Sequence, residues 1–332
     1  MKIIVDDKIP YIRGHVERMA GEVIYLPGSE IGPGDVRDAD ALLVRTRTRC
    51  DRRLLENSRV RFIATATIGY DHLDTRYLGE AGIRWTNCPG CNAASVGQYV
   101  RNALLEAERA GLVRLAEATV GIIGCGHVGT AVGRALRPYV SRIVANDPLL
   151  AAHADFPLSD LETVRRECDI ITLHTPLTTD GPHPTFHLID REFLQSVGKR
   201  PLLINAARGG VVDERALREA LDEGRIRQAV IDTWEGEPDI DWELLKRVFI
   251  GTPHIAGYSA DGKANATRMT LEALARFVAA DGEASATPDI RPAEAPAART
   301  GLWYSPSEDS ERLKENPAGF EFQRGNYPLR RE

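Results

Sequence analysis

The chain has 332 residues, which is enough for about two domains of ordinary size. Hydrophobic residues make up 43% and charged residues 27%, as expected of a globular chain that can bury a large core. The 42 lysines and arginines against 48 aspartates and glutamates leave a net charge of −6, which argues against a general nucleic-acid binder.

Neither a targeting segment nor a membrane span is expected from the sequence. The N-terminal apolar run ends at Asp6 and Asp7 and is too short for a secretory signal. The longest uncharged stretches, residues 85–100 and 118–133, are too rich in Gly, Asn and Ser to span a bilayer. The 5 cysteines are an odd and sparse set, which indicates free thiols in a reducing compartment. We therefore expect a cytoplasmic protein with no membrane or nucleic-acid partner.

Short β-branched runs alternate with amphipathic stretches along most of the chain. Several runs are apolar throughout, which is typical of strands buried on both faces of a parallel sheet. Alternating strands and helices predict an α/β fold with doubly wound parallel sheets. The predicted strands cover residues 2–5, 23–26, 41–44, 61–65, 83–86, 119–123, 142–146, 169–173, 201–205, 228–231 and 248–250.

The strands form two sets, which predict two domains with a cleft between them. Long helical stretches at residues 92–110 and 260–280 bracket the second set, so we expect the second domain to be inserted into the first. A proline- and alanine-rich linker follows, and a short tail carries one helical signal at residues 307–314. The predicted boundaries are 1–93 with 257–283 for the first domain, 94–256 for the inserted domain, and 284–332 for the linker and tail.

A glycine-rich loop lies between the strand at 119–123 and a helical segment. Gly124 permits the tight turn, Gly126 lets a pyrophosphate approach the backbone, and Gly129 lets the helix pack against the strand. The helix N-terminus then offers free N–H groups to phosphates, beginning at His127 and Val128. The loop therefore predicts a dinucleotide site in a Rossmann-like inserted domain, the first domain being built on a similar sheet.

Asp147 ends the strand that follows the glycine-rich loop. A carboxylate at this place binds both ribose hydroxyls and repels a 2′-phosphate. We therefore expect NAD rather than NADP as the cofactor.

Three chemically useful side chains follow successive predicted strands: Arg208, Glu237 and His254. Oxidation of a secondary alcohol needs a base for the hydroxyl proton, and histidine titrates in the right range. A carboxylate beside the histidine orients it and stabilises the imidazolium. A guanidinium can bind a substrate carboxylate in a bidentate manner. Singly, such residues are more often surface charges, but their joint placement at strand ends predicts a catalytic set.

Several motifs are similar to those of one enzyme family, the D-isomer-specific 2-hydroxyacid dehydrogenases. The chain resembles this family over roughly residues 1–282 in its glycine-rich loop and in three further segments, 204–213, 232–238 and 253–257. Within the family it is most similar to the branch of erythronate-4-phosphate dehydrogenases, and this resemblance rests on residues 64–72, 89–93, 174–182 and 254–264.

The resemblance implies NAD-dependent oxidation of 4-phospho-D-erythronate at C2, a step of pyridoxal phosphate biosynthesis. It implies that Arg208, Glu237 and His254 are catalytic, with His254 as the proton carrier. It further implies no metal, a substrate-binding first domain and a homodimer. The implied NAD contacts are Asp147, Thr175, Ala206, Arg208, Asp232 and Gly257, and the implied substrate contacts are Thr46, Thr67 and Tyr258.

The substrate phosphate needs local cations, because the net charge of the chain is −6. Arg45 and Arg47 share one face of an extended segment and are candidates for a phosphate clamp. The competing interpretation is a solvated edge strand whose charges limit aggregation.

Substrate, function class and the role of two cysteines stay open at the level of sequence. The enzyme could act on glycerate, lactate or 3-phosphoglycerate, or the protein could be a NAD-sensing binding protein like the corepressors of this superfamily. Cys88 and Cys91 form a CxxC pair that could serve redox or zinc chemistry. The branch named above usually carries a longer C-terminal dimerisation domain, so residues 284–332 are interpreted as a truncated form of it.

Overall fold

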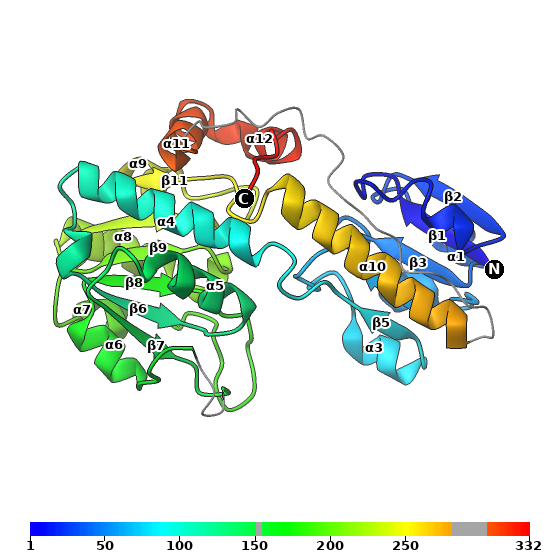
Figure 1. Ribbon diagram of the computed structural model, residues 1–332, viewed down its shortest axis with the longest axis horizontal. Coiled ribbons are helices and arrows are strands. Elements are labelled where there is room, and N and C mark those ends of the chain that lie inside the picture. Colours follow the sequence, from blue (N-terminus) through cyan, green and yellow to red (C-terminus); the bar gives the residue numbers. More distant parts are fainter. Residues whose placement is uncertain (151–154, 281–303) are drawn as a thin grey trace. The chain divides into compact units, whose positions relative to one another are not determined.

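The computed structural model describes residues 1–150, 155–280 and 304–332 (Figure 1). The chain divides into two compact units. The first comprises Met1–Asn92 and the helix α10 (Ala260–Ala280), and the second comprises Ala93–Tyr258 with the C-terminal segment as far as Arg330. None of the described helices combines the length and apolar character that crossing a membrane requires.

The first unit is built on a five-stranded parallel sheet in the order β2-β1-β3-β4-β5. Alternate side chains of β1 enter two separate cores, because successive residues of a strand point to opposite faces. On one face, Phe277 of α10 stacks on Phe62 with ring centroids 4.8 Å apart. The short helices cover the other face with Val36, Leu54 and Leu78. The strands are β1 (Lys2–Asp6), β2 (Glu22–Leu26), β3 (Ala41–Val44), β4 (Phe62–Thr65) and β5 (Arg84–Thr86), and the helices on that face are α1 (Pro33–Val36), α2 (Arg52–Leu55) and α3 (Thr75–Glu80).

The second unit contains a six-stranded parallel sheet in the order β11-β10-β9-β8-β6-β7. Helices α4 (Ala93–Arg109) and α5 (His127–Leu136) pack on one face, and α6 to α9 pack on the other. The strands are β6 (Thr119–Ile123), β7 (Arg142–Asn146), β8 (Ile170–Leu173), β9 (Leu202–Asn205), β10 (Gln228–Ile231) and β11 (Ile250–Gly251). The remaining helices are α6 (Leu161–Glu167), α7 (Arg191–Gln195), α8 (Glu214–Asp222) and α9 (Trp242–Arg247).

Strand order fixes where each sheet receives ligands. In both sheets the first strand lies between the second and the third, so the winding direction reverses beside β1 and beside β6. Open α/β sheets bind ligands beyond the carboxyl ends of their strands at such a reversal. In the second unit this point lies between β6 and β8.

The C-terminal segment packs on the second unit. Helix α11 (Pro306–Glu315) contacts β11 and α4, and a short helix α12 (Phe320–Gly325) follows it (Figure 1). The Gly251 N–H donates to the Ser310 hydroxyl at 2.9 Å, and Lys314 Nζ donates to the Val248 carbonyl at 2.7 Å. The segment therefore covers the last strand of the sheet.

The predicted fold class is confirmed: both sheets are parallel and Rossmann-like. Most predicted strand bounds agree with the structure to within one residue, and the largest difference is at the last strand. Residues 248–250 were predicted as the last strand, but Val248 caps α9 through a bond from its N–H to the Leu244 carbonyl, so β11 begins at Ile250. Helix α11 was predicted within two residues at its ends, whereas α12 was not predicted. The predicted linker lies largely outside the described residues.

Candidate active site

The glycine-rich loop occupies the reversal point of the second sheet. Gly124 has a φ of +89°, and a Cβ there would lie 2.7 Å from the carbonyl carbon of His174, at the end of β8. A Cβ on Gly129 would lie 1.9 Å from the Gly124 oxygen, so the start of α5 presses on the loop. Within the described ranges, no side chain or distant backbone atom lies within 4 Å of the Cβ position of Gly126, which leaves space for a ligand. The loop therefore fits the pyrophosphate of a dinucleotide.

Buried polar atoms without partners lie beside this loop. His174 Nδ1 and Thr175 Oγ1 are both buried and have no hydrogen-bond partner among the described residues. Burial lowers the pKa of His174 to about 3, so its ring is neutral at physiological pH. Buried polar groups are normally satisfied, so these two atoms fit a site that a polar ligand completes. Thr175 is one of the predicted NAD contacts.

Asp147 follows β7 and lies against the same loop. Its Oδ2 accepts a hydrogen bond from the Cys125 N–H at 2.9 Å, and its Oδ1 accepts one from the Leu149 N–H at 3.1 Å. The carboxylate is thus held beside the glycine-rich loop, as the ribose contact requires.

The three predicted catalytic residues follow three adjacent strands: β9 precedes Arg208, β10 precedes Glu237 and β11 precedes His254. Their loops are pressed together, because a Cβ on Gly209 would lie 1.9 Å from the Trp234 carbonyl oxygen. The structure therefore brings these loops to one edge of the sheet, although they lie well apart along the chain.

The side chains of Glu237 and His254 are hydrogen-bonded to each other. His254 Nδ1 lies 2.8 Å from Glu237 Oε2 and 3.1 Å from Oε1, and the Trp234 N–H donates to Oε1 at 2.9 Å. Burial raises the pKa of Glu237, but His254, the Trp234 N–H and the Arg324 guanidinium outweigh it, so that the pKa lies below its usual value. An ionised carboxylate only accepts hydrogen bonds, so Nδ1 carries a proton and Nε2 is the atom left for a substrate.

The loop that carries His254 is strained and is held by Asp232. His254 has a φ of +56°, which is rare for a residue with a side chain, and its N–H donates to the Asp232 carbonyl at 2.8 Å. The Asp232 carboxylate is buried and accepts hydrogen bonds from the Thr252 hydroxyl and from the N–H groups of Ile255 and Ala256 at 2.7–3.0 Å. Sequence reasoning missed this structural role. The NAD contacts of Asp232, Ala206 and Gly257 stay predictions.

The predicted substrate contacts are divided between the units. Arg45 and Thr46 follow β3 and Thr67 follows the neighbouring β4 in the first unit, whereas Tyr258 belongs to the second unit. The Thr67 hydroxyl donates to the Gly69 carbonyl at 2.8 Å, and Arg45 Nη1 donates to the Lys8 carbonyl at 3.1 Å. Arg45, Thr46 and Thr67 therefore share the carboxyl edge of the first sheet.

Comparison with known proteins gives the family. The sequence profile of the D-isomer specific 2-hydroxyacid dehydrogenase NAD binding domain matches residues 92–256. The erythronate-4-phosphate dehydrogenase of Bacteroides fragilis is 50% identical over 338 residues, covering 100% of this chain and 97% of that protein. The chain therefore belongs to the family of D-isomer specific 2-hydroxyacid dehydrogenases. It is accordingly an NAD-dependent dehydrogenase that acts on a CH–OH group.

Further members of the family and solved structures agree. The erythronate-4-phosphate dehydrogenase of Porphyromonas gingivalis is 40% identical, covering 100% of this chain and 94% of that protein. A crystal structure of D-lactate dehydrogenase from Aquifex aeolicus with NAD and lactic acid has a TM-score of 0.71 at 23% identity, covering 85% of this chain and 96% of that one, and shows the same fold. Because the Bacteroides fragilis relative is covered almost completely, the short C-terminal segment is not peculiar to this chain.

The two cysteines of the CxxC pair are buried, and neither forms a disulfide with a described residue. Cys88 Sγ donates to the Ala266 carbonyl at 3.2 Å, and burial raises the pKa of the Cys88 thiol to about 11. Redox chemistry needs the thiolate, which such a pKa disfavours at Cys88. Both cysteines pack with Ala266 in a small apolar cluster. The structure therefore supports a packing role for the pair.

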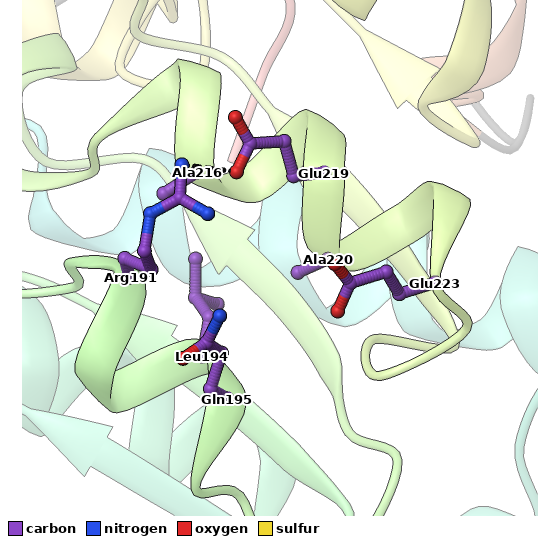
Figure 2. Close-up of a pocket in the computed structure, with 7 residues that line it drawn as sticks. All are labelled: Arg191, Leu194, Gln195, Ala216, Glu219, Ala220 and Glu223. Carbon is purple, nitrogen blue, oxygen red and sulfur yellow. Dashed lines mark ion pairs between the residues drawn. The ribbon is translucent and has the colours of Figure 1, made fainter.

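A small pocket lies between α7 and α8 (Figure 2). Arg191 and Glu219 point toward one another across it and form an ion pair. Leu194 and Ala216 line the rest together with Gln195, Ala220 and Glu223. This pocket is a seam between two helices, and it contains none of the predicted site residues.

The position of Asp147 leads to a prediction about cofactor choice. We expect Asp147→Asn to weaken NAD binding by about 10- to 100-fold, because hydrogen bonds to a charged carboxylate are lost. The preference for NAD over NADP should narrow, because the repulsion of the 2′-phosphate disappears. Binding titrations with both dinucleotides measure the two effects. Asp155→Asn, which breaks the surface pair with Arg134, is the matched control. If the ratio of the dissociation constants for NADP and NAD is the same in Asp147→Asn as in the wild type, the role of Asp147 is contradicted.

Proposed function

We propose that this enzyme uses NAD to oxidise 4-phospho-D-erythronate at C2 to (R)-3-hydroxy-2-oxo-4-phosphooxybutanoate, a step of pyridoxal phosphate biosynthesis. The proposal is carried by the hydrogen bond between His254 and Glu237 in a chain that is 40–50% identical over its full length to relatives of that name.

In the proposed reaction, each residue has one task. His254 Nε2 accepts the proton of the C2 hydroxyl, and Glu237 stabilises the imidazolium that results. Arg208 binds the substrate carboxylate and orients C2. NAD, which the glycine-rich loop and Asp147 would hold, would supply the acceptor for the hydride that leaves C2. The proton on His254 then passes to solvent, so that the products are the 2-oxo acid, NADH and one proton.

A substrate comparison tests the proposal. 4-Phospho-D-erythronate, D-erythronate, D-glycerate, D-lactate and 3-phosphoglycerate are each offered with NAD, with a hydrazine to trap the oxo acid, and NADH formation is followed by absorbance. We expect the highest kcat/KM for 4-phospho-D-erythronate. Efficient turnover of an unphosphorylated acid would refute the assignment. NAD binding without oxidation of any of these acids would favour a sensor.

Arg45 supplies a test of the phosphate site. The Arg45 cation lies close enough to the Asp6 carboxyl group to act on its pKa. Burial raises the pKa of Asp6, and the Lys8 N–H and the Arg45 cation oppose that rise. We expect Arg45→Ala to raise KM for the phosphorylated substrate by about 10-fold or more, because one charge-assisted contact is lost, and to leave NAD affinity unchanged. Arg49→Ala removes an exposed guanidinium that pairs with Asp51, and serves as the control. Equal KM values for the Arg45 variant and the wild type would place Arg45 off the phosphate.

We further propose that the enzyme is a cytoplasmic homodimer. The resemblance to the wider dehydrogenase family, whose members dimerise through the helices around the NAD domain, supports the dimer, and the odd and sparse set of cysteines supports a reducing compartment. Light scattering at several protein concentrations, with and without residues 304–332, tests the oligomeric state, and a stable monomer of the whole chain would refute it.

A further inference from the structure

The C-terminal segment brings a cation to the proposed catalytic pair. Arg324 lies at the end of α12, and its Nη1 is 3.5 Å from Glu237 Oε2, the oxygen that also pairs with His254. Arg324 Nε lies 3.3 Å from the Tyr258 hydroxyl. All of these residues belong to the second unit. The side chains of Arg324, Glu237 and His254 are 21%, 18% and 27% exposed, so bulk water screens their charges only in part.

The placement of Arg324 is fixed by its neighbours. Glu321, one turn earlier in α12, pairs with the same guanidinium at 3.6 Å. Farther along the tail, Tyr327 packs edge-on against Tyr258 with ring centroids 6.2 Å apart. Arg330 Nη1 donates to the Tyr258 carbonyl at 2.9 Å. The contacts of Arg324, Tyr327 and Arg330 thus attach the tail to Tyr258, in the loop that carries His254.

The surroundings of the pair are otherwise rich in acids. Asp232 is buried under the His254 loop, and Glu214 of α8 lies close enough for its charge to interact with that of Glu237. Glu235 is a further acid in the same unit, and its side chain pairs with His187. Burial raises the pKa of Glu214 to about 8, so this acid is largely uncharged at neutral pH. Glu237 and Asp232 are the acids whose negative charges act on the His254 ring, because negative charges stabilise a nearby cation. A base that holds its proton too tightly is slow to return to the neutral form.

We propose that Arg324 is a positioning residue. Its guanidinium holds the Glu237 carboxylate in place and weakens the electrostatic attraction between that carboxylate and the His254 imidazolium. His254 then releases the substrate proton to solvent and is neutral for the next turnover. This inference rests on the proposed roles of His254 and Glu237. The Arg324 cation also contributes to the lowered pKa of Glu237, in keeping with the geometry.

The test is the pH dependence of kcat/KM. In Arg324→Met the acidic limb of the kcat/KM profile, the part in which activity rises with pH, should shift to higher pH by about half a pH unit to one pH unit. The reason is that a cation near Glu237 is lost. At a pH on that limb kcat/KM should fall about 3- to 10-fold, and it should converge with the wild type at high pH. Arg324→Lys keeps the charge and should keep the wild-type limb. Arg324→Gln, which keeps polar contact with Tyr258 but has no charge, should behave like the Met variant and serves if the latter fails to fold.

Two further measurements separate this inference from the proposed function. Arg312→Met removes another guanidinium of the same tail, which pairs with Asp309, and should leave the limb in place. The proton resonances of the His254 ring, identified by their loss in His254→Asn, report its titration by NMR without any substrate. They should titrate at higher pH in Arg324→Met. The role of Arg324 would be overturned if neither the acidic limb of the kcat/KM profile nor the NMR titration of the His254 ring moves in Arg324→Met. This holds whether kcat/KM is unchanged or falls equally at every pH. If the enzyme oxidises no hydroxy acid, the NMR titration of the His254 ring still tests the role of Arg324.

Discussion

Replacing His254 by alanine is expected to reduce kcat by about 10²- to 10⁴-fold, the range that general acid–base catalysis contributes. Nε2 is the ring nitrogen left for the substrate, because Nδ1 is held by Glu237 at 2.8 Å. The variant leaves water to take the hydroxyl proton. NAD affinity should stay near the wild-type value, because the glycine-rich loop and Asp147 lie at the ends of different strands. Single-turnover kinetics and a NAD titration measure the two quantities.

The chain offers a matched control for this variant. His187 pairs with Glu235 at 2.9 Å in the same unit, and it also has a positive φ, of +50°. His187→Ala removes a similar hydrogen-bonded histidine–glutamate pair at a place that the proposed mechanism does not use, so we expect a change in kcat of only a few-fold. Comparable losses in the two variants would show that an unspecific effect on the loops, and not proton transfer, explains the His254 result.

The sequence predicted the strand ends well because apolar runs define them locally. Strands β6, β7 and β10 have the predicted bounds, and each is followed by a predicted site residue. Arg208, Glu237 and His254 could be grouped because parallel strands place their carboxyl ends at one edge. The side chain of His254 could be paired with Glu237 on chemical grounds alone, and the structure places the two in contact.

Residues that act across long sequence distances were not predictable in this way. Asp232 was predicted only as a NAD contact, because nothing local indicates that its carboxylate binds the backbone of Ile255 and Ala256. The tail had a single helical signal, and no motif in it indicated a role for its arginines. Arg324 is more than 60 positions from Glu237 and Tyr258, so its role depends on packing and not on a pattern in the sequence.

Arg330 is the residue whose loss should destabilise this site most. It is 8% exposed, and its side chain donates to the carbonyls of Ile255 and Tyr258 at 3.1 and 2.9 Å, to the Ser95 hydroxyl at 3.0 Å, and to the Ala256 carbonyl. Burial acts to lower the pKa of Arg330, but the facing phenols of Tyr304 and Tyr327 and the Asp309 carboxylate outweigh it, so the side chain keeps its charge.

We expect Arg330→Met to lower the free energy of unfolding by about 2–5 kcal/mol, because several buried acceptors lose their donor at once. Urea denaturation of the second unit measures this loss, and limited proteolysis should cut the tail faster. kcat/KM should fall as well, since the freed carbonyls belong to the loop that follows His254. Arg312→Met, at a side chain that is 57% exposed but pairs with the buried Asp309, should change the free energy of unfolding by no more than about 1 kcal/mol. If the Arg330 and Arg312 variants unfold at the same urea concentration, the tail does not hold the His254 loop.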